Sequence, residues 1–306
     1  MPDPVLRIVD AQAGGDVSRV IVGGAPTLDG TSVAEKCADF ARRFDHLRLK
    51  LMQPPHGAMH MCPVLLLPPE RPDSDFGVII MESMGYPPIS GSNLFCAAAV
   101  ALEHGFADMR EPDTHLRVET PAGLVTITAR CSDGRCRQVE FENTPSCIKS
   151  GLLVQPTSTT DRVQMTLVAA GVDYAVVSAR ELGIPLAPAS YDDLRRSGSR
   201  LARESATDFV LFYDDIERTG PEIHCTIAVF QNPGVICFSP TGTGTSAMLT
   251  LMHSRGEIDA AETLIAKSPA GNVFQGRILA AGTRAAEPLR TAISGNVALL
   301  GPVVIP

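Results

Sequence analysis

The chain has 306 residues, of which 44% are hydrophobic and 20% charged, and its formal net charge is -8, so it is long enough for two domains of about 150 residues. The acidic balance excludes the electrostatic attraction that drives nucleic-acid binding, and the absence of Trp with only 4 Tyr argues against an aromatic binding platform. No apolar run approaches the roughly 20 residues that span a bilayer, and Met1-Pro2-Asp3-Pro4 lacks the pattern of a secretory signal, so we expect a cytoplasmic protein without a membrane segment.

The first half of the chain is predicted to open with a hairpin and a helix. Two short apolar runs flank Ala13-Gly14-Gly15-Asp16, whose glycine pair is typical of a tight turn. A helix is predicted over residues 31–44, because Ser32 is placed as an N-cap and Glu35, three residues later, completes a capping-box pattern. The strands predicted in this half lie at residues 6–9, 19–22, 62–67, 76–81, 116–120, 123–130 and 138–143.

A second helix of this half, over residues 94–104, is apolar almost all round. Such a helix is expected to be buried on every side. A sheet must therefore wrap around it.

The second half is predicted to repeat the order of the first. Helices are expected over residues 192–204 and from about 245 to 255. The final strand, over residues 296–304, is expected to return to the first half. The other strands predicted here lie at residues 164–168, 175–178, 209–213, 224–230, 235–238 and 276–279.

Two loops in opposite halves of the chain read alike. Ser90-Gly91-Ser92-Asn93 and Thr241-Gly242-Thr243-Gly244 each place hydroxyl and glycine residues directly before an apolar helical run, and they lie 151 residues apart, about half of the chain. The first N–H groups of a helix have no internal partner and lie at the positive end of its dipole. We infer an ancient duplication that gives two domains, each with one anion-binding loop, so that both loops bind one small anion.

No metal site and no cofactor are predicted. The 8 cysteines include one close pair, Cys131 and Cys136, but form no CxxC motif, so free buried thiols are expected. No GxGxxG motif follows a predicted strand, and no P-loop is present.

With these features the chain resembles the proline racemase family, which contains proline racemases, hydroxyproline 2-epimerases and trans-3-hydroxy-L-proline dehydratases. The resemblance implies an α+β fold of two pseudo-symmetric domains, each a curved sheet or barrel around a central helix, with the active site in the interdomain cleft. We expect residues 1–130 with 295–306 to form the first domain and residues 131–294 the second. The residues that carry the likeness are Gly14-Gly15 with Arg19-Val20, Leu67-Pro68-Pro69, Asp73 to Gly77, Ser90-Gly91-Ser92-Asn93, Tyr174 after Gly171, Thr241 to Ala247, and Phe274-Gln275-Gly276-Arg277.

The resemblance places Ser90 and Thr241 at the two catalytic positions, which are cysteines in the racemases and epimerases of the family. A thiol titrates near pH 8.5, whereas an aliphatic hydroxyl is a far weaker acid. Racemisation by two thiols is therefore hard to sustain here. Dehydratases of the family resemble this chain at one or other position but usually keep one cysteine, and the loss of both leaves the general base open.

A further difference concerns the substrate amine. Many relatives have a histidine two residues after the first catalytic position and an aspartate four residues before the second, where this chain has Ser92 and Cys237. The second change removes a fixed negative charge, so a cationic prolinium would be bound less well. By resemblance Tyr174 lies near the substrate, while a core tyrosine is the plain alternative. The candidate substrate-binding residues are Gly91, Ser92, Asn93, Cys237, Gly242 and Thr243.

The leading hypothesis is a cofactor-free lyase, like a trans-3-hydroxy-L-proline dehydratase, which acts on a small amino or imino acid. The first alternative is an amino-acid racemase or hydroxyproline 2-epimerase. The second is a catalytically inactive homologue that binds a small carboxylate. A homodimer is implied by the resemblance alone.

Overall fold

The computed structural model describes residues 5–154, 162–280 and 288–305, and the chain divides into two compact units. Unit 1 comprises Met1–Phe141 and Gly295–Pro306, and unit 2 comprises Glu142–Ser294. The boundary expected after residue 130 falls within strand β6 (Gly123–Ser132), which pairs with β7 (Arg135–Glu142) as a hairpin. The division after residue 141 keeps nearly all of this hairpin in unit 1. The opening Met1-Pro2-Asp3-Pro4 lies outside the described residues.

Unit 1 begins with the predicted hairpin, β1 (Leu6–Ala13) and β2 (Asp16–Gly23). Gly14 and Gly15 have φ of 57° and 87°, which is the left-handed backbone that a two-residue hairpin turn requires. The glycine pair therefore fixes this turn, as predicted.

Helix α1 (Val33–Met52) begins where the capping pattern predicts and ends later. The Ser32 side chain accepts a hydrogen bond from the backbone N–H of Glu35 at 3.2 Å. Phe44, the predicted last residue, has non-helical angles and marks a kink, but the helix continues for two further turns. The prediction stopped short although Leu47 and Leu51 continue the apolar spacing of the helix and join the same core cluster.

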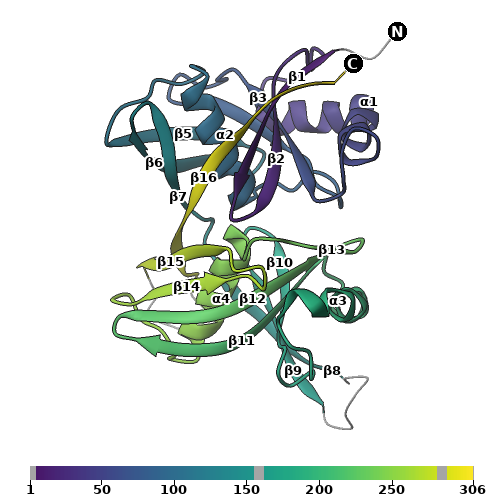
Figure 1. Cartoon of the computed structure of the whole chain (residues 1–306), viewed down its shortest axis with the longest axis vertical. Coiled ribbons are helices and arrows are strands. Elements are labelled where there is room, and N and C mark those ends of the chain that lie inside the picture. Colours follow the sequence, from purple (N-terminus) through teal and green to yellow (C-terminus); the bar gives the residue numbers. More distant parts are fainter. Residues whose placement is uncertain (1–4, 155–161, 281–287, 306) are drawn as a thin grey trace. The chain divides into compact units, whose positions relative to one another are not determined.

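The strands of unit 1 follow one another in a closed order around α2 (Gly91–Glu103) (Figure 1). Every residue of α2 from Gly91 to Leu102 is buried, as its all-round apolar sequence predicts. The last strand, β16 (Arg290–Ile305), lies next to β7 in the order and pairs with β1 through residues 297–305. The remaining strands of this unit are β3 (Met61–Leu67), β4 (Phe76–Ile80) and β5 (Asp113–Thr120).

Unit 2 builds the same arrangement around α4 (Gly242–Ser254). An isolated bridge between Ser146 and Leu289 joins the two ends of the strand order. Two pairs of hydroxyl groups connect α4 to the surrounding strands by hydrogen bonds. Ser246 contacts Thr291 at 2.9 Å, and Thr250 contacts Ser146 at 2.6 Å. The other elements are β8 (Cys147–Val154), β9 (Val163–Ala169), β10 (Asp173–Ser178), η1 (Pro188–Ser190), α3 (Tyr191–Ser205), β11 (Phe209–Thr219), β12 (Glu222–Gln231), β13 (Val235–Ile236), β14 (Thr263–Lys267) and β15 (Val273–Ala280).

The two units repeat one pattern of strand pairing, which confirms the predicted pseudo-symmetry. Each central helix spans 13 residues and is followed by a glycine of positive φ, Gly105 or Gly256. The corresponding pairs are antiparallel β1–β2 and β9–β10, parallel β2–β3 and β10–β11, antiparallel β3–β4 and β11–β12, parallel β4–β5 and β12–β14, antiparallel β5–β6 and β14–β15, and antiparallel β6–β7 and β15–β16.

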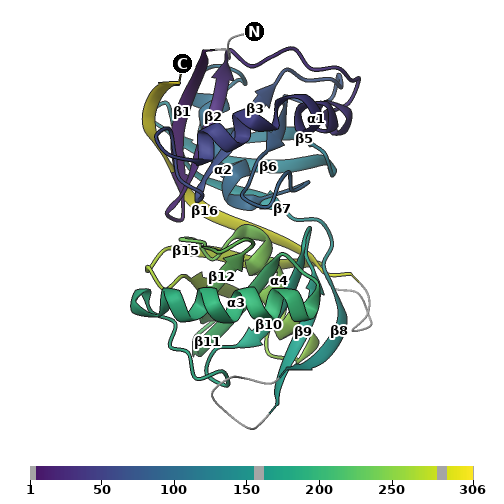
Figure 2. The ribbon, with the colours of Figure 1, turned by 90° about the vertical axis from the view of Figure 1, so that its right-hand side faces the viewer.

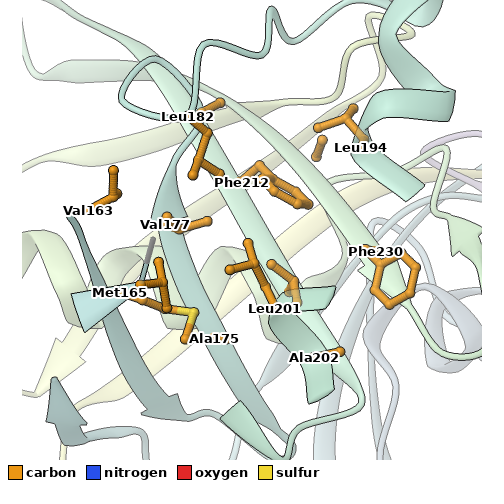
Figure 3. Packing of buried hydrophobic residues seen from close by; sticks show 14 of the residues in the cluster. Val163, Met165, Ala175, Val177, Leu182, Leu194, Leu201, Ala202, Phe212 and Phe230 are labelled. Atoms are coloured by element: carbon orange, nitrogen blue, oxygen red, sulfur yellow. The ribbon is translucent and has the colours of Figure 1, made fainter. Parts of the chain in front are cut away.

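Helix α3 covers the outer face of the unit 2 sheet, where it packs on β10, β11 and β12 (Figure 2). Leu194, Leu201 and Ala202 of the helix join a buried cluster with Phe212 and Phe230 of the strands (Figure 3). Gly198 lies within this contact, and a Cβ built there would be 2.3 Å from the Phe230 ring. The missing side chain therefore lets the helix approach the sheet closely.

We predict that Gly198→Ala lowers the free energy of unfolding by about 1–3 kcal/mol, although Ala normally favours a helix by about 1 kcal/mol, because the added methyl group overpacks the contact with Phe230. Denaturant unfolding measures the change, with Arg203→Ala on the exposed side of the same helix as control. An unchanged or raised stability of Gly198→Ala would contradict this packing.

Candidate active site

The start of α2 presents backbone N–H groups that its own helix does not use. Ser90 is the N-cap, and the first intrahelical bond runs from the Leu94 N–H to the Ser90 carbonyl. Within the described part of the chain, no protein acceptor bonds the N–H groups of Gly91, Ser92 or Asn93, although all three residues are buried. These donors suit a carboxylate or another anion.

The Ser90 side chain does not cap its helix. Its Oγ accepts a hydrogen bond from Asn93 Nδ2 at 3.0 Å, and the backbone is extended, with φ of -155° and ψ of 122°. N-capping, the ordinary use of a serine at this place, is therefore not the role of this hydroxyl.

Asn93 is held by two residues from outside the loop. Ser18 of β2 donates to its Oδ1 at 2.6 Å, and its Nδ2 donates to Glu82 Oε1 at 2.9 Å. Ser18 is 0%, Asn93 3% and Glu82 6% exposed. Sequence reasoning missed Ser18 and Glu82, because Ser18 lies 75 residues from Asn93 and Glu82 belongs to no motif.

The start of α4 is built differently. Thr241 Oγ1 accepts from the Gly244 N–H at 2.9 Å, so this hydroxyl does cap its helix. A Cβ at Gly244 would lie 2.4 Å from that oxygen, so the cap requires glycine there. Thr241 has φ of 58° and ψ of 147°, a strained conformation for a β-branched residue that is typical of functional sites.

Tyr174 places its hydroxyl at the same helix start. Its ring is fully buried, and its oxygen lies 3.1 Å from Thr241 Oγ1 and 2.8 Å from Thr243 Oγ1. It is thus a core tyrosine whose hydroxyl group contacts two residues of the candidate site. The N–H groups of Gly242 and Thr243, as far as the described residues go, bond no protein acceptor and form the second open helix start.

Cys237 lies just after β13, four residues before Thr241. Its side chain is 9% exposed, its N–H donates to the Val229 carbonyl at 2.9 Å, and its sulfur lies 4.0 Å from Gln231 Oε1. No fixed charge is supplied by a thiol–amide contact of this kind.

Two cysteine thiols near the Ser90 loop have raised pKa values. Burial, together with the charges of Glu82 and Asp16, raises the pKa of Cys62 well above its usual range. Burial raises the pKa of Cys96 to about 12. Both thiols are therefore protonated at neutral pH, and neither is a thiolate base.

In residues 5–154, 162–280 and 288–305, no group of three or more His, Cys, Asp or Glu side chains is arranged to hold a metal ion. None of the helices in these ranges has both the length and the apolar character needed to cross a bilayer.

The strain at Thr241 predicts different responses at the two caps. Glycine relieves a positive φ, so the stability advantage of Thr241→Gly over Thr241→Ala should exceed that of Ser90→Gly over Ser90→Ala by about 1 kcal/mol. Thermal unfolding of the four variants measures it. Equal differences at both positions would contradict the strained backbone.

Comparison with known proteins shows the family of this chain. The family model described as proline racemase matches residues 8–304. A proline racemase of Clostridioides difficile is 30% identical over 290 residues, which cover 90% of this chain and 86% of that protein. A protein of Chromohalobacter salexigens is 35% identical over 287 residues, covering 89% and 80%.

Solved structures agree. A probable proline racemase from Agrobacterium radiobacter with bound carbonate has a TM-score of 0.88 at 28% identity, covering 98% of this chain and 93% of that one. A hydroxyproline epimerase from Agrobacterium vitis with bound trans-4-hydroxy-L-proline has a TM-score of 0.87 at 26% identity, covering 98% and 92%. A PhzF-family protein of Bacillus anthracis, at 10% identity and a TM-score of 0.68 over 99% of both chains, shares the fold alone. The match over nearly the whole length shows that this chain belongs to the proline racemase family.

Proposed function

We propose that this protein is a cofactor-independent hydro-lyase that dehydrates a 3-hydroxyproline-like imino acid. The observation that carries the proposal is the chemistry of the two open helix starts. Each presents free backbone N–H groups and a hydroxyl residue, Ser90 or Thr241, where the racemases of the family use a thiol. Two thiols suit reversible proton exchange at one carbon, whereas two hydroxyls do not.

In the proposed reaction both helix starts bind the carboxylate of one substrate. A general base on the Thr241 side takes the α-proton, and the N–H groups stabilise the negative charge that then develops on the carboxylate. The bond from the β-carbon to the 3-hydroxyl then breaks, the hydroxyl takes up a proton and departs as water, and the product tautomerises to pyrroline-2-carboxylate. Ser90 and Thr241 act on opposite faces of the substrate.

The two hydroxyls are proposed to have different roles. Ser90 Oγ accepts from Asn93, so its own hydrogen can point to a substrate oxygen, which suits proton donation to the departing hydroxyl. Thr241, bonded to Gly244 and Tyr174, faces the α-proton side. An elimination needs one proton donor and one proton acceptor, and the unlike surroundings of the two residues support that division.

The substrate class is supported by the relatives. The bound molecules named for the two similar structures are carbonate and trans-4-hydroxy-L-proline, and both carry an anionic oxygen group. This chain has Ser92 and Cys237 where many relatives bind the substrate amine with His and Asp. The ring nitrogen is therefore proposed to be bound less strongly than the carboxylate.

Epimerisation or racemisation of an amino acid is the second candidate, favoured by the names of the similar proteins. It differs from dehydration in one measurable respect. Epimerisation in heavy water places deuterium on the α-carbon with inversion, and no water is lost.

We predict that the wild-type protein in heavy water converts trans-3-hydroxy-L-proline to pyrroline-2-carboxylate, as followed by NMR. Ser90→Ala should lower kcat about 100-fold or more, since a positioned proton donor is worth that much. Ser132→Ala, an exposed serine in the β6–β7 turn, is the matched control.

Three outcomes separate the candidates. Pyrroline product supports the lyase. Deuterium wash-in with inversion of proline or 4-hydroxyproline, without pyrroline, supports the isomerase. If no isomer reacts but ligands raise Tm, the protein is a binding homologue and the proposed activity is wrong.

Tyr174→Phe is predicted to lower kcat by about 10-fold or more with little change in KM. The variant keeps the buried ring but removes the hydroxyl that contacts Thr241 and Thr243. The control is Tyr213→Phe, whose hydroxyl accepts from Arg255 away from either helix start. An unchanged kcat would show that the Tyr174 hydroxyl takes no part in the reaction.

A further inference from the structure

Glu82 is a buried carboxylate that the proposed reaction leaves unused. It lies two residues beyond β4, at a bridge with Gly85, and its Oε1 receives a hydrogen bond from Asn93 Nδ2 at 2.9 Å. The same nitrogen donates to Ser90 Oγ at 3.0 Å. Since both oxygens bond one nitrogen, the carboxylate and the Ser90 hydroxyl lie no more than about 6 Å apart.

The charge on Glu82 determines which way the Asn93 amide points. An ionised carboxylate only accepts hydrogen bonds, so the NH2 end of Asn93 must face it. Ser18 can donate to the other end, Oδ1, at 2.6 Å. The amide of Asn93 thus has one orientation that satisfies both neighbours.

This orientation has a consequence for Ser90. An amide nitrogen carries two hydrogens, and with one on Glu82 the other is directed at Ser90 Oγ. Asn93 cannot accept a proton from Ser90 through that nitrogen. The Ser90 hydroxyl is therefore prevented from donating to its own loop, and its hydrogen is left for a ligand.

We propose that Glu82 is a positioning residue which, through Asn93, makes Ser90 a hydrogen-bond donor toward the substrate. The inference rests on the proposed function for the identity of the substrate oxygen, and on the three hydrogen bonds for everything else. It excludes Ser90 as the general base, because no acceptor in this chain of contacts takes its proton.

Asn93→Asp tests this polarity with a side chain of the same shape. An aspartate would accept the Ser90 hydrogen and would also face Glu82 as a second buried carboxylate. At pH 8 we expect Tm to fall by about 5 °C or more and kcat by about 100-fold. Asn232→Asp, at an exposed Asn–Asp pair with Asp208, is the matched control.

The double variant Glu82→Gln with Asn93→Asp distinguishes the effect of hydrogen-bond direction at Ser90 from the effect of lost stability. The glutamine amide can donate to the aspartate, and the aspartate can accept from both Ser18 and Ser90. The three hydrogen bonds of residue 93 are thus restored, with Ser90 now the donor. We expect Tm to return to within about 2 °C of wild type while kcat stays low. A merely structural role predicts that activity returns with Tm, and that result would overturn the proposal.

Binding of pyrrole-2-carboxylate, a planar carboxylate probe measured by calorimetry, keeps the test independent of turnover. Both aspartate variants should bind it at least about 10-fold more weakly than wild type. If wild type binds the probe but dehydrates no 3-hydroxyproline, the proposed function fails while the role of Glu82 is still decided by Kd and Tm. Equal Kd values in wild type and the double variant, or no binding by wild type, would refute the role of Glu82.

Discussion

The unpaired N–H groups at the starts of α2 and α4 are the constraint on which the rest of the structure depends. Both helices are surrounded by strands, and their first residues are buried. A buried N–H group without a partner is costly, so such helix starts need an acceptor of some kind. A bound carboxylate is the acceptor that we propose.

The two units share the same pattern of strands around a central helix, but their helix starts differ. Ser90 has an ordinary extended backbone and an amide donor backed by Glu82, whereas Thr241 has a strained backbone and a hydroxyl that caps its helix and contacts Tyr174. In symmetric proton exchange, each of the two positions acts in turn as proton acceptor and proton donor. An elimination needs a proton donor at one position and a proton acceptor at the other. We favour elimination because the two helix starts differ in structure.

The sequence was enough to predict the central helices, their burial and the hairpin at Gly14-Gly15, because each depends on local periodicity or turn chemistry. It did not reveal β8, which is mostly exposed and lacks alternation, or β14, which has only five residues. The end of α1 was misplaced because the predicted helix ended at Phe44, where the helix kinks but continues to Met52.

The loops of the candidate site were found from sequence because they repeat, but their surroundings were not. Ser18 lies 75 residues from Asn93, the loop residue that it contacts, and Tyr174 was placed near the site only by the resemblance to a family. Contacts across such separations leave no pattern in a single sequence. The capping role of Thr241 and the lack of one at Ser90 likewise depend on backbone angles that the residue types alone do not set.

The central proposal is that both helix starts bind the same carboxylate. The most direct measurement follows the backbone amide signals of Gly91 and Gly242 by NMR while pyrrole-2-carboxylate is titrated into the protein. The account predicts that both signals shift with one shared Kd at a stoichiometry of one ligand per chain. Two different dissociation constants, or a shift confined to one of the two glycines, would contradict it.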